Sequence, residues 1–222
     1  LMHNEDTQQF STGLYVKDCL MGVGTMTYYN PETQSFGSLG HAMSDVELNE
    51  QALIKSGTIY RSSVTGIRKG SQNQAGQKIA TISDIEIGEI DDHSAFGIYG
   101  KYNEDAISKR KTMETAEISE VKLGKAYFLT VLQDDEIVEC EIEITALEPQ
   151  NTVSQKGISF TIIDKEVLEK SDGIVQGMSG SPIIQDGKII GCVTHVSSTN
   201  QSTGYGLYID WMLETDRKST PF

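Results

Sequence analysis

The chain has 222 residues, and its 32 acidic side chains against 18 basic ones give a formal net charge of −14. A chain of this length can bury one large core, and all-β barrels of this size commonly form a single structural unit. So acidic a protein is repelled by a nucleic-acid backbone and by an anionic membrane, which argues against both as partners. No apolar run approaches the roughly 18 residues that span a bilayer, no signal peptide is recognisable, and the cysteines are too few for a disulfide framework.

The apolar residues fall mostly in short β-branched runs separated by turn residues, which predicts the strands of a sandwich or barrel. Residues 1–9 are polar and without periodicity, and we interpret them as a linker outside the fold. The strands predicted in the first half lie at residues 22–29, 35–41, 57–67 and 78–87, with an exposed loop at 70–76. The first two strands form a hairpin that ends at His41, which places this histidine at the mouth of a loop. The acidic run 84–92 is interpreted as a strand with a solvated face, because it lacks the glycine and glutamate positions of a calcium loop.

The second half continues the same pattern beyond a polar segment. Strands are predicted at residues 126–132, 136–146 and 158–163, followed by one or two helical turns at 164–170. Residues 182–196 are predicted to form two apolar strands joined at Asp186-Gly187, a favoured two-residue hairpin turn. Residues 207–214 combine the end of a strand with a short amphipathic helix. The sequence therefore predicts an all-β protein with short helices, one of them C-terminal.

The run Gly177-Met178-Ser179-Gly180-Ser181-Pro182 has the composition of a tight turn that presents a serine. A serine hydroxyl becomes a nucleophile only when a base takes its proton and hydrogen-bond donors stabilise the oxyanion formed on attack. The glycines allow the backbone to bend so that the amides of Gly177 and Ser179 can converge on one oxygen position. The run therefore predicts a nucleophile with an oxyanion hole, if a base lies within reach.

The base would most naturally be a histidine, and the sequence holds four. His3 lies in the predicted linker, and His93 lies in an acidic turn where it is expected to face solvent. His195 lies in a predicted strand. His41 ends the first hairpin, and although a lone histidine is usually a hydrogen-bonded structural residue, its pairing with Ser179 favours a role as the base.

A histidine-terminated hairpin early in the chain and a G-x-S-G-x-P serine followed by a β-hairpin late in the chain resemble the chymotrypsin-type serine peptidases. The segments GLYVKD, GTMTYYNPET, FGSLGHAMSD, GIVQGMSGSPIIQDGKIIGCVTHV and TGYGLYIDWML are similar to the sporulation peptidases typified by stage IV sporulation protein B, from about Gly13 to Leu213. The resemblance implies a double β-barrel of chymotrypsin-like type. Residues 10–110 would form the first barrel, with the histidine, and residues 111–222 the second, with the serine. Together they would make one peptidase domain, without the membrane segment and PDZ domain of that family.

By that resemblance His41 is the general base, Ser179 the nucleophile and Asp164 the acidic member of a triad. However, Asp164 stands immediately before the predicted helix, where an aspartate is the expected N-cap. Chymotrypsin-like topology normally takes the acid from the first barrel, well before the serine loop. The acidic residues that stay open as alternatives for orienting the imidazole are Asp45, Asp84 and Asp105.

The strand after the serine hairpin borders the specificity pocket in chymotrypsin-like folds. By analogy, Thr194, His195 and Val196 are candidates for lining the substrate cleft. Cys192 and His195 are close enough in sequence for half of a metal site, but no second Cys/His pair completes four ligands. We therefore predict no metal site and no cofactor.

The predicted activity is that of a serine endopeptidase acting through an acyl-enzyme. The resemblance implies a protein substrate in a membrane-associated signalling complex of bacterial spore formation, and no direct membrane contact by this domain. It implies export from the forespore into the space between the forespore and mother cell membranes, with a membrane anchor in the full-length protein, activation of a late sigma factor, and self-cleavage. One alternative is a catalytically silent barrel that binds a peptide by strand addition. Another is an esterase, which is disfavoured because no G-x-S-x-G surrounds Ser179.

Overall fold

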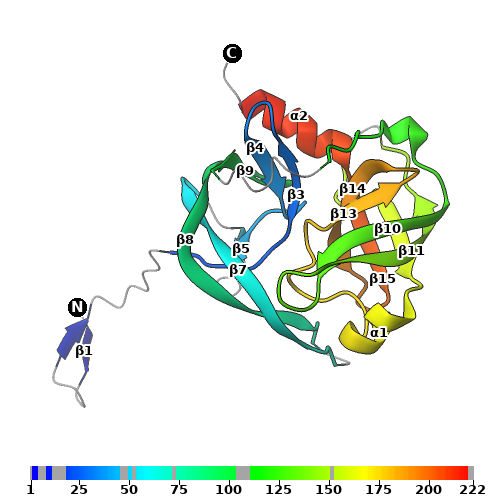
Figure 1. Cartoon of the computed structure of the whole chain (residues 1–222). Helices are drawn as coiled ribbons and strands as arrows, with labels where there is room; N and C mark the ends of the chain where they lie inside the picture. The colour runs from blue at the N-terminus through cyan, green and yellow to red at the C-terminus, as the bar shows by residue number, and fades with distance from the viewer. Residues whose placement is uncertain are drawn as a thin grey trace.

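The computed structural model describes residues 2–4, 9–11, 19–45, 50–51, 54–71, 74–103, 111–150 and 153–219. Its two main parts are a five-stranded antiparallel sheet from the first half of the chain and a closed six-stranded barrel from the second half (Figure 1). Among the described residues, no helix is both long and apolar enough to cross a lipid bilayer.

The five-stranded sheet has the order β3-β4-β9-β8-β7. Its strands are β3 (Met26–Asn30), β4 (Ser35–Ser38), β7 (Gly57–Arg68), β8 (Gln77–Ser94) and β9 (Gly97–Tyr102). Two short strand pairs accompany it, β1 (Met2–Asn4) with β2 (Gln9–Ser11) and β5 (Ser44–Asp45) with β6 (Glu50–Gln51). Strands β7 and β8 form a long hairpin that extends along the barrel, and its tip lies beside helix α1 (Figure 1).

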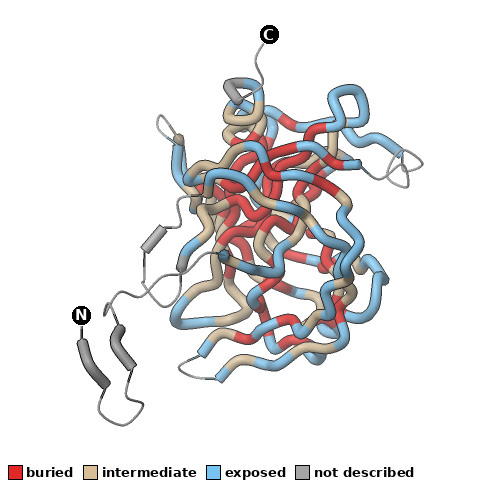
Figure 2. Tube along the Cα trace, turned by 90° about the vertical axis from the view of Figure 1, so that its left-hand side faces the viewer, coloured by how far each residue is buried: buried red, intermediate tan, exposed pale blue. Residues whose placement is uncertain are grey.

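The closed barrel has the order β10-β11-β12-β15-β14-β13. Its strands are β10 (Gly124–Val131), β11 (Ile137–Leu147), β12 (Ile158–Ile162), β13 (Pro182–Gln185), β14 (Lys188–Val196) and β15 (Thr203–Tyr208). The helices are a 3₁₀ turn η2 (Ile118–Glu120), α1 (Lys165–Ser171) and α2 (Ile209–Ser219). Buried and more exposed residues alternate along β10 to β12, and the buried apolar residues form the core of the barrel. The buried stretches of the chain are red in Figure 2.

The C-terminal helix α2 joins the two parts. Asp216 on this helix accepts hydrogen bonds from the hydroxyls of Tyr28 at 3.0 Å and Ser35 at 3.1 Å, both in the sheet. One turn earlier on the same face of α2, Met212 is buried in a cluster with Cys192 of the barrel. Because α2 contacts both parts, it fixes the position of the sheet relative to the barrel beside the cleft between them.

The predicted all-β fold with short helices, one of them C-terminal, is confirmed, although the first half forms an open sheet where a closed barrel was expected. For most of the predicted strands, both ends lie within two residues of the ends of an observed strand. The turn at Asp186-Gly187 has positive φ at both residues, 51° and 79°, as a primed hairpin turn requires. Strand β9 was not predicted, and β8 runs on through the acidic stretch, so His93 lies in a strand and not in a turn. The division at residue 110 stays a prediction.

Candidate active site

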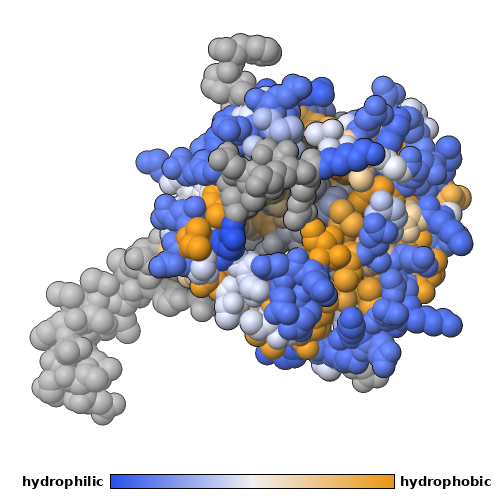
Figure 3. Space-filling model, in the orientation of Figure 1, coloured by the Kyte–Doolittle hydropathy of each residue, from blue (hydrophilic) through white to orange (hydrophobic). Residues whose placement is uncertain are grey.

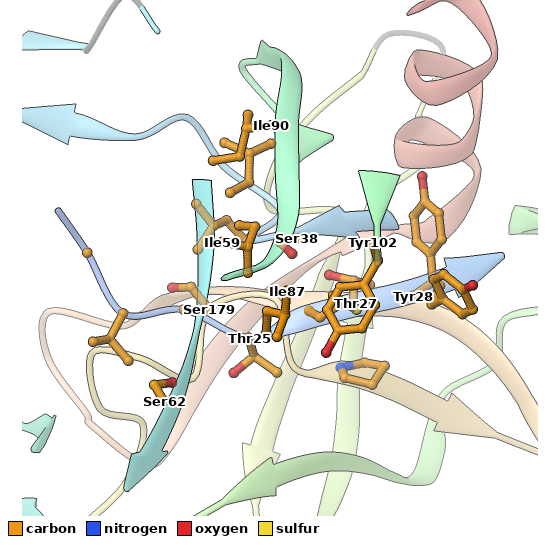
Figure 4. A pocket seen from close by; sticks show the side chains of 18 of the residues that line it. Thr25, Thr27, Tyr28, Ser38, Ile59, Ser62, Ile87, Ile90, Tyr102 and Ser179 are labelled. Atoms are coloured by element: carbon orange, nitrogen blue, oxygen red, sulfur yellow. The ribbon is translucent and has the colours of Figure 1, made fainter. Parts of the chain in front are cut away.

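A broad cleft between the sheet and the barrel holds two of the three predicted catalytic residues, His41 and Ser179. His41 enters it from the sheet half, just after β4, and Ser179 enters it from the barrel half, just before β13. In the close view of Figure 4, Ser179 lies near Thr25, the residue just before β3, while Thr27 lies on that strand. Apolar side chains are exposed along the edge of the hollow, near the end of β10 (Figure 3).

The loop that carries Ser179 is tightly folded. Its backbone closes on itself through hydrogen bonds from Met178 N–H to Val175 O at 3.1 Å and from Ser181 N–H to Met178 O at 2.9 Å. Gly180 has a φ of +89°, and a Cβ at that position would overlap the Thr25 carbonyl oxygen. Only glycine can take this conformation so close to another backbone, so the glycine after the serine is required by the fold.

Two threonines of the sheet half hold the carbonyl groups of the serine loop. Thr25 Oγ1 donates to Gly177 O at 2.9 Å, and the Thr25 N–H donates to Ser179 O at 2.9 Å. Thr27 Oγ1 donates to Gly180 O at 2.8 Å in a buried bond. Three carbonyls of the loop are therefore bound on one side, by residues about 150 positions earlier in the chain. The sequence analysis missed both threonines.

The amides predicted to form the oxyanion hole are available as donors. Within the described part of the chain, neither the Gly177 N–H nor the Ser179 N–H donates a hydrogen bond. Unpaired buried N–H groups are rare in proteins, and at a cleft they are typical of anion or oxyanion recognition. The two N–H groups can therefore donate hydrogen bonds to an oxygen atom of a ligand.

The ring of His41 is oriented by the main chain next to it. His41 follows Leu39 and Gly40, which have φ values of 75° and 69°, so the backbone turns sharply after β4. His41 Nδ1 lies 2.8 Å from the carbonyl oxygen of Ala42. Because a carbonyl oxygen only accepts, Nδ1 carries the proton and Nε2 keeps its lone pair. This tautomer is the one that a general base needs.

His41 and Ser179 meet at the same short segment of β14. The Ser179 hydroxyl donates to Thr194 O at 3.3 Å and makes no hydrogen bond with His41. The ring of His41 lies 5.5 Å from the ring of His195, centroid to centroid. Since Thr194 and His195 are adjacent in β14, both catalytic candidates contact the same two-residue segment of this strand.

The three residues predicted to line the cleft differ in their surroundings. Thr194 is buried, and its hydroxyl bonds to carbonyls of Gln155 and Tyr205, away from Ser179. Val196 is half-buried at the end of the strand. His195 contacts His41, and burial, followed by the charges of His41 and Lys156, lowers the pKa of His195 to about 4. Its buried Nδ1 has no partner among the described residues. His195 is therefore a neutral ring beside His41 at neutral pH.

Asp164 lies apart from His41 and Ser179. Its Oδ1 accepts from Val167 N–H at 3.0 Å, as the N-cap of α1, and its Oδ2 lies 3.5 Å from Glu141 N. It lines a separate depression on the barrel, beside Tyr127 and Glu139. Among the described side chains, no carboxylate contacts His41. Of the alternatives, Asp84 is exposed on β8, the side chain of Asp45 is not described, and Asp105 lies outside the described residues.

The comparison with protein families agrees with the peptidase prediction. The family model described as SpoIVB peptidase S55 matches residues 8–213. No curated protein sequence gives a significant match. Among solved structures, the active form of the Rv3671c protease from M. tuberculosis is similar with a TM-score of 0.44 and 13% identity, over 71% of this chain and 78% of that one. The inactive form of the same protease gives a TM-score of 0.43 and 14% identity, over 72% of this chain and 88% of that one.

Proposed function

Because this chain belongs to the SpoIVB peptidase S55 family, we propose that it cleaves a signalling protein during bacterial spore formation. The chain is a serine endopeptidase by its family, and the roles of individual residues are part of the proposal. One observation supports these roles: Ser179 contacts Thr194 and His41 contacts the adjacent His195. Next to them, the N–H groups of Gly177 and Ser179 have no hydrogen-bond partner among the described residues.

In the proposed mechanism, His41 Nε2 takes the proton from Ser179 Oγ as that oxygen attacks the carbonyl carbon of the scissile bond. The oxyanion forms hydrogen bonds with the N–H groups of Gly177 and Ser179. The tetrahedral intermediate collapses, and the leaving amine takes the proton from His41. A water molecule, deprotonated by His41, then hydrolyses the acyl ester and restores Ser179.

The first step requires the Ser179 hydroxyl to leave the Thr194 carbonyl. A change of side-chain rotamer is enough, and such changes are fast compared with catalysis. The Ala42 carbonyl holds the His41 tautomer throughout. We assign Asp164 an indirect part, because as the cap of α1 it supports the segment that leads into the serine loop.

We also propose, from the family, the setting in which this peptidase acts. The substrate is a protein of a membrane-associated signalling complex in the space between forespore and mother cell, reached by export from the forespore and anchoring of the full-length protein. Cleavage leads to activation of a late sigma factor, and the peptidase also cleaves itself.

The test is covalent labelling of Ser179 by an active-site phosphonate, together with hydrolysis of a peptide library. Wild type should label and hydrolyse, while Ser179→Ala and His41→Ala should lose about three orders of magnitude or more in kcat. Ser181→Ala is a matched control, because Ser181 lies in the same loop with a buried hydroxyl that has no hydrogen-bond partner among the described residues. It should label like wild type.

A folded wild-type chain that neither labels nor hydrolyses would contradict the peptidase proposal. If that protein still bound library peptides without cutting them, the silent peptide-binding barrel would be the better description. Hydrolysis of simple esters without any peptide cleavage would favour the esterase.

A further inference from the structure

A lysine in the first half of the chain lies buried under the serine loop. Lys78, near the start of β8, is 5% exposed, and its ammonium donates to Thr130 Oγ1 of β10 at 2.9 Å. Thr130 is 2% exposed and is the only hydrogen-bond partner of this ammonium among the described residues. Burial lowers the pKa of Lys78 to about 8. An apolar side chain would fill this place without the free energy of removing an ammonium group from water. Packing alone therefore does not explain a lysine at this position.

The backbone of Lys78 binds the peptide group that carries one of the two oxyanion donors. The Lys78 N–H donates to Gln176 O at 2.9 Å, and the Gln176 N–H donates to Gly76 O at 2.8 Å. The carbonyl of Gln176 and the N–H of Gly177 belong to one planar trans peptide, in which they point in opposite directions. Because Lys78 fixes the direction of that carbonyl, it also fixes the direction of the Gly177 N–H.

The second donor does not depend on the sheet half in this way. The Ser179 N–H shares its peptide with Met178 O, and this carbonyl is held by the Ser181 N–H inside the same loop. One donor of the oxyanion hole is thus set by the serine loop itself. The other is set by β8, a strand of the other half of the chain.

The side chain of Lys78 also packs against Gly177. A Cβ added to Gly177 would lie 3.0 Å from Lys78 Cδ and 3.2 Å from Lys78 Cβ and Cγ. The stem of the lysine therefore lies directly beneath the Gly177 backbone, while its end is tied to Thr130 on the barrel. These contacts hold the start of β8 against the loop from two sides.

We propose that Lys78 is a positioning residue that orients the Gly177 peptide, so that the β7–β8 hairpin completes the oxyanion hole. The ammonium-to-hydroxyl bond with Thr130 anchors the strand, and the backbone N–H of Lys78 then holds the Gln176 carbonyl. This inference rests on the proposed peptidase mechanism, and it adds a residue that does not touch the substrate.

The experiment compares Lys78→Met and Thr130→Val with two controls in the full chain. Thr130→Ser keeps the accepting hydroxyl, and Lys125→Met removes an exposed lysine from the same strand β10. Each variant is measured for kcat and KM on a peptide from the library, and for affinity to a peptidyl aldehyde, which forms a tetrahedral adduct with the serine. Thermal unfolding of each variant is recorded alongside.

We expect Lys78→Met and Thr130→Val to lower kcat and the affinity for the aldehyde by about tenfold or more, with KM changed by less than about twofold. Thr130→Ser and Lys125→Met should stay near wild type. A smaller folded fraction would also lower the apparent kcat without changing KM, so kcat is calculated per folded molecule from the unfolding curve. It would not weaken the binding of the aldehyde by the folded molecules, which is therefore the deciding readout.

Folded Lys78→Met or Thr130→Val protein with wild-type kcat and aldehyde affinity would overturn the inference, as would a raised KM with kcat unchanged. Thr130→Val is isosteric, so it decides the matter alone if Lys78→Met does not fold. A wild-type protein that neither hydrolyses the peptide nor binds the aldehyde would instead overturn the peptidase proposal, and this inference with it.

Discussion

Replacing Asp164 separates a helix cap from a catalytic acid. Its Oδ1 accepts the Val167 N–H at 3.0 Å at the start of α1, a helix of seven residues. Asparagine caps helices about as well as aspartate, whereas alanine has no acceptor, so the two substitutions differ in their effect on the helix. In a triad, by contrast, asparagine in place of the acid stabilises the wrong tautomer of the histidine.

The structure gives different magnitudes for the two roles. For a cap, Asp164→Ala costs about 1 kcal/mol, or a fall in Tm of about 2–4 °C for a chain of this size, while Asp164→Asn costs a few tenths of a kcal/mol. Because the Ala42 carbonyl holds His41 Nδ1, Asp164→Asn should keep kcat within about threefold of wild type. A triad acid would lose about 10⁴-fold in kcat on the same change.

The assay is peptide hydrolysis and phosphonate labelling of both variants, with thermal unfolding followed by circular dichroism. Asp164→Asn that unfolds like wild type but has lost three or more orders of magnitude in kcat would refute the cap assignment. It would mean that Asp164 reaches His41 in the active state, as the family resemblance implies.

Three more substitutions probe contacts around the cleft. Gly180→Ala places a Cβ against the Thr25 carbonyl, so phosphonate labelling of Ser179 should slow by at least about tenfold; labelling at the wild-type rate would count against the close packing of the loop. Thr27→Val leaves a buried carbonyl without its donor, and urea unfolding should show a loss of about 1–3 kcal/mol; a loss under about 0.5 kcal/mol would contradict this. His195 has a pKa of about 4 in the folded protein against 6.5 for the free side chain, so the unfolded chain takes up a proton that the folded chain does not. Stability should therefore fall as the pH drops from 7 to 4, by on the order of 1 kcal/mol more in wild type than in His195→Gln. Equal pH dependence of stability in the two proteins would disprove the lowered pKa of His195.

The fold could be predicted from local patterns where those patterns were clear. Alternating apolar residues and turn residues identified β7, β10 and β11 nearly to their ends, and the aspartate before α1 predicted the start of that helix. Strand β9 was missed because it contains two glycines in six residues, which interrupt the alternation. Closure of a sheet depends on strand tilt and stagger, so an open sheet and a barrel have similar local sequences.

The candidate site likewise has residues that the sequence could predict and residues that it could not. Ser179 and His41 lie in short segments with distinctive glycines, which the sequence displays directly. Thr25 acts on Gly177, 152 positions later, and Lys78 acts on Thr130, 52 positions later. Threonine and lysine in a strand carry no signal of such contacts, because only the docking of the two halves creates them. The position of Asp164 relative to His41 could not be read from the chain for the same reason.

The proposed catalytic geometry therefore depends on how the two halves dock, more than on either half alone. The barrel closes on itself and has its own core, and the half of the chain that forms it contains both Ser179 and the peptide groups of the proposed oxyanion hole. Yet the carbonyls of the serine loop are bound by Thr25 and Thr27, and the Gly177 peptide is bound by Lys78, all from the sheet half. Since these bonds break when the sheet moves away, a small shift between the halves would disable the serine loop while leaving the barrel folded. The sheet half therefore supports the loop of the proposed nucleophile Ser179, in addition to carrying His41.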